Sequence, residues 1–171
     1  MRSKFIVPAV LSLSAPALSG CSTPGPIASV EEGITTCTLT REGTDIFFGA
    51  PINNPSDTEI TILDVTAKKS VNTEAVEFGI DEAAHVVGVA YYPDSSVEAD
   101  PEATTSIEFM VSPQNAVIKP DHTAGLVLKI VPQDPTSNAS VSEIRIKYQV
   151  DGTTHTATDR SVYELAPQTC E

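Results

Sequence analysis

Three histidines, His85, His122 and His155, are the residues of this sequence best suited to bind a metal ion. Imidazole nitrogens bind zinc and copper, and the sulfur of Met110 would add a soft ligand that favours copper. No two of the histidines have the close HxH or HxxxH spacing of a ligand pair. We therefore interpret them as exposed or packed side chains and expect no metal site, with a copper carrier as the alternative.

Catalytic signatures are absent from the sequence. It contains no GxSxG elbow, no SxxK, HExxH or GxGxxG motif and no Walker loop. The three histidines would also be the only imidazole bases for a Ser/His/Asp set. We therefore expect a protein that is not an enzyme and has no cofactor.

Two polar segments, residues 53–57 and 92–105, are the places where we expect a ligand site if the chain has one. Irregular loops on a rigid scaffold often carry binding function. Carboxylates in the second segment could bind calcium, but the spaced Asp/Asn and Gly of a dedicated calcium loop are missing, so a solvated acidic loop is preferred. The candidate residues are Asn53, Asn54, Asp57, Asp94, Glu98, Asp100 and Glu102.

The charge balance argues against nucleic acid as a partner. The formal net charge is −13, and Lys68-Lys69 is the only adjacent basic pair. Binding to phosphates needs clustered Lys and Arg side chains. Aromatic residues make up only 5% of the chain and Trp is absent, which disfavours a surface that stacks on sugars or bases.

The N-terminus has the organisation of an export leader. Residues 1–4 are basic, residues 5–18 are apolar but too short and interrupted to span a membrane, and small residues follow. The stretch Leu18-Ser19-Gly20-Cys21 resembles the lipobox of bacterial lipoproteins. The resemblance implies that the leader is removed before Cys21 and that acylation of this cysteine holds the protein on the extracytoplasmic face of the cell membrane.

This organisation divides the chain into three parts. Residues 1–20 form the signal peptide, and residues 21–36 form the acylated N-terminus and a flexible tether, since Pro and Gly discourage regular structure there. Residues 37–171 form one domain. Cys37 and Cys170 are the remaining cysteines, and an even number in an exported protein predicts a disulfide between them.

Alternation of apolar and polar residues predicts that the domain consists of β-strands. Residues 142–150 alternate cleanly, and Asp151-Gly152 after them favours a hairpin into a Thr-rich strand. Residues 105–111 and 123–131 also alternate. The pattern in residues 59–67 changes register, which predicts a bulge near Ile62. Residues 84–92 are apolar on both faces and predict a central strand.

Further strands are expected at residues 45–50 and 161–165. No window of the sequence shows convincing helical spacing; residues 70–84 come nearest to it. Eight or nine short strands favour an all-β, antiparallel, immunoglobulin-like sandwich, with a closed β-barrel as the alternative. The leader, tether and sandwich together resemble bacterial surface lipoproteins of unassigned role. They predict a membrane-anchored interaction domain with a partner in the cell envelope; the alternative is a carrier of a small ligand or copper.

Overall fold

The structure is a computed structural model that describes residues 25, 27, 33–84, 88–92 and 110–170. Strands dominate this part of the chain, and no helix occurs in it. The strands are β1 (Thr35–Leu39), β2 (Asp45–Asn54), β3 (Ile60–Val71), β4 (Thr73–Asp81), β5 (Gly88–Tyr92), β6 (Val117–Ile118), β7 (His122–Pro132), β8 (Ala139–Val150) and β9 (Thr153–Ala166).

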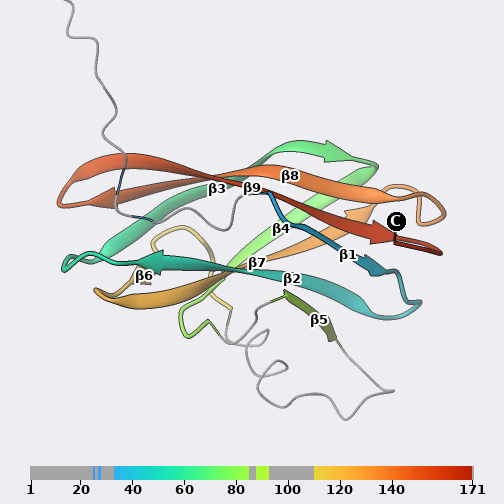
Figure 1. The fold of residues 1–171 in the computed structure, drawn as a ribbon, viewed down its shortest axis with the longest axis horizontal. Coiled ribbons are helices and arrows are strands. Elements are labelled where there is room, and N and C mark those ends of the chain that lie inside the picture. Colours follow the sequence, from blue (N-terminus) through green and yellow to red (C-terminus); the bar gives the residue numbers. More distant parts are fainter. Residues whose placement is uncertain (1–24, 26, 28–32, 85–87, 93–109, 171) are drawn as a thin grey trace, which may run out of the picture.

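These strands form two sheets that pack face to face (Figure 1). One sheet has the order β1-β9-β8-β3-β6 and the other the order β4-β7-β2-β5. The all-β, immunoglobulin-like sandwich is therefore confirmed. The alternative of a closed barrel is wrong, because among the described residues no strand pairing joins the two sheets.

The sandwich departs from a purely antiparallel arrangement at β1, which runs parallel to β9 with Thr35 opposite Val162. Of the residues before β1, Gly25 lies against His155, near the start of β9.

The core lies between the sheets and is built from the alternating apolar residues. Phe48, Leu128 and Ile146 are among the side chains with no exposed surface. Phe48 and Tyr163 belong to opposite sheets, and their rings pack in an edge-to-face arrangement with centroids 5.6 Å apart. Burial of each such side chain stabilises the fold by about 1.5–3 kcal/mol.

The predicted hairpin and bulge are confirmed. Asp151 and Gly152 connect β8 to β9 with φ values of 47° and 77°, as a two-residue turn with two positive φ angles requires. The register between β3 and β8 shifts between Ile62 and Asp64. This shift keeps Ile60 and Ile62 before it and Val65 after it in the main core.

Other predicted strands need correction. Residues 153–166 form one continuous strand, β2 extends to Asn54, and residues 73–81 form β4. β5 lies at the end of its sheet and not in the centre. Both faces of β5 are apolar because Ala90, on the second face, packs with Phe47 and Val127 in a small cluster separate from the main core. Of the strand predicted at 105–111, only the last two residues are described.

The predicted disulfide between Cys37 and Cys170 is confirmed, and it joins β1 to the C-terminal segment. The domain begins earlier than residue 37, because β1 starts at Thr35. Within the segment expected to be a tether, Ile27 is only 6% exposed and belongs to the core; most of that segment lies outside the described residues.

Candidate functional site

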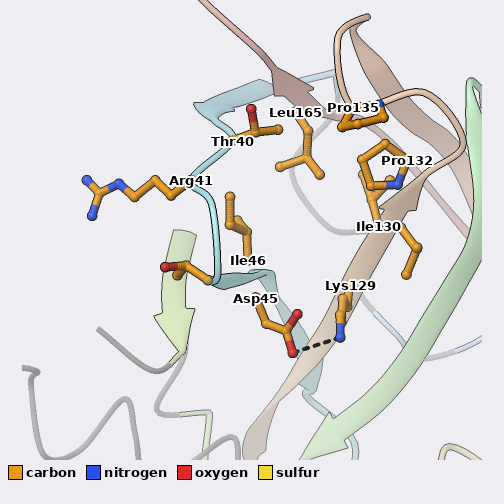
Figure 2. Close-up of a pocket in the computed structure, with 11 residues that line it drawn as sticks. Thr40, Arg41, Asp45, Ile46, Lys129, Ile130, Pro132, Pro135 and Leu165 are labelled. Carbon is orange, nitrogen blue, oxygen red and sulfur yellow. Dashed lines mark ion pairs between the residues drawn. The ribbon is translucent and has the colours of Figure 1, made fainter. Parts of the chain in front are cut away.

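A pocket of about 270 Å³ opens at one end of the sandwich (Figure 2). We call it the end pocket. Residues from Thr40 to Ile46, at the β1–β2 connection and the start of β2, form one wall, and residues from Lys129 to Pro132, at the end of β7, form the other. Pro135 and Leu165 complete it. Because Leu165 belongs to the five-stranded sheet and Ile46 to the four-stranded sheet, the pocket exists only when both sheets are packed together.

The floor of the end pocket is apolar. Ile46, Ile130 and Leu165 belong to the main core and expose 3–5% of their surface. Pro132 and Pro135 lie beside Leu165 (Figure 2). Because the proline ring fixes φ, these two residues keep the wall in one shape. A side chain that entered the pocket would bury apolar surface on a preformed floor.

The rim of the end pocket carries charge. Lys129 Nζ lies 2.8 Å from Asp45 Oδ2, and the Lys129 side chain is only 21% exposed. Arg41 extends away from the floor (Figure 2), and its guanidinium lies 4.2 Å from the centroid of the Tyr91 ring. The Tyr91 hydroxyl is hydrogen-bonded to Thr38 at 2.5 Å. Charged and apolar groups therefore border the same opening, which suits a partner that combines both.

The loop that carries Pro135 is held in place by hydrogen bonds. Thr136 donates its hydroxyl and its backbone N–H to Asp134 Oδ1, and Ser137 donates to Oδ2. These donors hold the pKa of Asp134 below its ordinary value, the Thr136 hydroxyl contributing most. The Asn72 amide, between β3 and β4, donates to the carbonyls of Asp134 and Ser137 at 2.8 and 3.1 Å. This wall of the pocket is thus ordered before any partner arrives.

Asn54, one of the predicted binding residues, is buried and 1% exposed. Its Nδ2 donates to the carbonyls of Thr58, Ile118 and Lys119 at 2.8, 3.1 and 3.0 Å. Its Oδ1 accepts from the backbone and hydroxyl of Ser56. These contacts use the donors and acceptors of the amide, so Asn54 holds three chain segments together and does not face a ligand.

The other two candidates in this loop are exposed. Asn53 Oδ1 accepts a hydrogen bond from Thr123 at 2.7 Å. Asp57 lines a polar hollow of about 460 Å³ together with Glu59 and Asp151. No group of three or more metal-binding side chains occurs in the described part of the chain. The hollow lies on the β8–β9 turn, not at the end pocket.

The remaining candidates of the acidic loop, Asp94, Glu98, Asp100 and Glu102, lie outside the described residues, as does His85. The structure does not bring His122, His155 and Met110 together. His122 Nδ1 lies 2.6 Å from the carbonyl oxygen of Pro120, and His155 stacks on Tyr148. Met110 packs on the cluster of Phe47, Ala90 and Val127.

Asp159 is a charged residue that sequence reasoning did not single out. It has no exposed surface, and it accepts hydrogen bonds from the Tyr163 hydroxyl at 2.6 Å and from the Ser161 backbone at 2.8 Å. Burial, the hydrogen bond to Asp159 and the charge of Asp159 raise the pKa of Tyr163. Because a ligand cannot reach this group, its role is to hold β9 in place.

Sequence reasoning also missed the end pocket. Its lining comes from segments as distant as Thr40 and Leu165, and none of them forms a motif. The one local signal was the Pro132 and Pro135 pair near the end of an alternating strand, which is typical of a shaped loop. Nothing in the sequence paired that loop with the β1–β2 connection.

Comparisons with known proteins give no family. No family model and no curated protein matches the chain. Among solved structures, the chain resembles the ASH/PapD-like domain of human CEP192 (PapD-like domain 7), with 11% identity, 95% of this chain and 100% of that chain covered, and a TM-score of 0.45. It also resembles the Vibrio cholerae VesB protease, with 10% identity, 79% and 31% of the two chains covered, and a TM-score of 0.39.

A third similar structure is a family 123 glycoside hydrolase from Clostridium perfringens, with 9% identity, 77% and 23% coverage, and a TM-score of 0.42. The chain thus spans about a third or less of the protease and the hydrolase. These distant similarities do not bear on activity or partners. Within the described residues, no helix is long and apolar enough to cross a membrane.

Proposed function

We propose that this protein is a lipoprotein, acylated at Cys21 and held on the extracytoplasmic face of the cell membrane, whose sandwich is a non-enzymatic binding domain for another protein of the cell envelope. The observation that carries the proposal is the Cys37–Cys170 disulfide. Structural disulfides form in oxidising compartments and are rare in the cytosol. The bond therefore supports the export that the lipobox resemblance implies.

The end pocket is the proposed contact with the partner. Its volume of about 270 Å³ is below the roughly 300–1,000 Å³ typical of small-molecule sites. It is large enough for one or two side chains on the floor of Ile46, Ile130 and Leu165. The rim then favours a segment that places an apolar side chain on this floor and a polar or charged group near Lys129 and Asp45. A side chain of a partner protein is therefore the occupant that we propose for the end pocket.

Acylation is tested by intact-mass measurement of the membrane-extracted protein. We expect loss of residues 1–20 and an acyl adduct on Cys21. Cys21→Ser should remove the adduct and release the protein from the membrane fraction, whereas the disulfide should be unaffected. A wild-type protein that retains its first 20 residues and carries no adduct would refute the anchor.

Partner binding is tested by in-cell photo-crosslinking with a photoreactive amino acid at Thr44, on the pocket rim. The matched control is Thr156, which is exposed on β9 away from the pocket. We expect a discrete protein adduct from Thr44 that is absent at Thr156 and is lost when Thr40→Trp fills the opening. Equal adducts at both positions, or adducts unaffected by Thr40→Trp, would show that the end pocket is not the contact.

The carrier alternative has its own test. A carrier of copper or of a small molecule is stabilised by its ligand through mass action. We expect no shift of the melting temperature of the exported domain with copper, because His122, His155 and Met110 have separate surroundings. A saturable rise with copper would favour the carrier.

A further inference from the structure

Gly25 and Ile27, close after the proposed acylation site, lie against one particular end of the sandwich. The backbone of Gly25 lies so close to Tyr148 and His155 that a Cβ at this position would overlap the Tyr148 phenol. Two residues later, Ile27 is buried in the core and makes a backbone hydrogen bond with the Tyr148 hydroxyl. Because of the overlap at position 25, only glycine fits there without moving Tyr148.

The attachment point lies near the β8–β9 turn. Tyr148 and His155 are opposite each other in the register of β8 and β9, and the connecting turn is Asp151-Gly152. The turn is at the left end of the sandwich in Figure 1, and the C-terminus is at the right end. The disulfide and the end pocket lie at the C-terminal end, since Cys37 is opposite Glu164, next to Leu165.

We infer that the β8–β9 turn is the surface that faces the lipid bilayer and that the end pocket points away from it. This inference rests on the proposed acylation of Cys21. Four residue steps lead from Cys21 to Gly25, and an extended chain covers at most about 3.6 Å per residue, so the Cα atom of Cys21 lies within about 14 Å of that of Gly25. A free tether over residues 21–36 would instead reach about 50 Å and leave the domain free to tumble.

The height of the end pocket above the membrane follows from the length of β9. From His155 to Leu165 the strand advances ten residues, or about 33 Å at about 3.3 Å per residue. The short connection therefore holds the turn near the headgroups while the sandwich raises the pocket by about that distance. The turn end is polar, with Asp57, Glu59 and Asp151 around one hollow. Such an acidic surface does not insert into the acyl region, so the short connection to the anchor, not the charge of the turn, holds this end near the membrane.

The experiment measures energy transfer from the acylated full-length protein, reconstituted in phosphatidylcholine vesicles, to an acceptor on the lipid headgroups. The donor is attached to a noncanonical amino acid at Thr153, in the turn end, or at Gln168, in the pocket end; both positions are exposed. We expect transfer from Thr153 to exceed that from Gln168 at least about threefold, because the two sites differ by about 30 Å along β9.

Ile27→Asp should reduce this difference, because a buried charge at position 27 would detach the arm and leave 14 residues, up to about 50 Å of chain, before β1. The matched control is Ile34→Asp: Ile34 belongs to the same segment and is 45% exposed, so the difference should persist. If Ile27→Asp does not fold, a Gly/Ser insert of about 12 residues between Ser22 and Gly25 adds up to about 40 Å of chain and should have the same effect.

Two results would overturn the inference in distinguishable ways. Equal transfer from both positions, in protein that carries the acyl adduct and stays with the vesicles, would refute the orientation and leave the anchor intact. A protein without the adduct that does not stay with the vesicles would refute the proposed anchor and the orientation with it.

Discussion

Asn54 offers the sharpest test of the difference between a ligand-binding residue and a structural one. Its amide makes three short contacts from Nδ2, of 2.8, 3.0 and 3.1 Å, and accepts two hydrogen bonds from Ser56. Because Nδ2 has two hydrogens, these correspond to about four full hydrogen bonds, each worth about 0.5–1.5 kcal/mol. Asn54→Ala should therefore reduce the free energy of unfolding by about 2–6 kcal/mol, and Asn54→Asp by more, since it turns a buried negative charge toward carbonyl oxygens.

The measurement is urea unfolding followed by far-ultraviolet circular dichroism, because the chain has no Trp for fluorescence. Asn53→Ala is the matched control. Asn53 is exposed and makes one side-chain hydrogen bond, with Thr123, so its loss should cost less than about 1 kcal/mol. If Asn54→Ala were no more destabilising than Asn53→Ala, the structural role assigned to Asn54 would be wrong and a role in binding would have to be reconsidered.

Three further predictions concern the disulfide and two ionisable groups. Replacing Cys37 and Cys170 by Ser opens a loop with a sequence separation of 133. Because chain entropy gives an upper bound of about 5 kcal/mol, urea unfolding should show that the free energy of unfolding falls by about 2–5 kcal/mol. A fall below about 1 kcal/mol would contradict the argument. Tyr163→Phe removes a donor from fully buried Asp159 and should cost about 1–3 kcal/mol in the same assay. The folded pKa of Tyr163 is raised above its unfolded value of 10.0, so its contribution to the free energy of unfolding is complete below pH 10 and declines as the pH rises further. This decline in stability should be weaker in Tyr163→Phe. The folded pKa of Asp134 is lowered, so its contribution to stability is present above the unfolded value of 3.8 and is lost as the pH falls through the folded value. Carboxyl NMR titration should therefore give a pKa below 3.8 for Asp134. A higher value would contradict the hydrogen bonds that Thr136 and Ser137 donate to it.

The elements that the sequence predicted well are those governed by local rules. Asp151-Gly152 formed the expected turn because a two-residue hairpin needs two positive φ angles wherever it occurs. The bulge next to Ile62 was visible because a shift of one residue reverses which side chains face the core. The centre of the sheet was not visible: β5 has an apolar pattern, yet it lies at an edge, since sheet order depends on pairings between distant segments.

Side chains with several partners were also beyond sequence reasoning. Asn53 and Asn54 are adjacent and chemically identical, but one is exposed and the other is buried under Thr58, Ile118 and Lys119. Only the approach of residues 118–119, more than 60 positions away, distinguishes them. For the same reason Ile27 read as part of a tether, although it packs in the core.

The sequence by itself determined the strand-rich character of the chain, one hairpin and one bulge, because alternation and turn chemistry act over short distances. It also determined the pairing of Cys37 with Cys170, because no other cysteine remains once Cys21 is assigned to acylation. The tertiary structure alone decided where the sheets meet, which end holds the end pocket and where the arm at Gly25 is attached. Each of these depends on surfaces made of residues far apart in the chain, and such surfaces form only when the two sheets bury their apolar faces against each other.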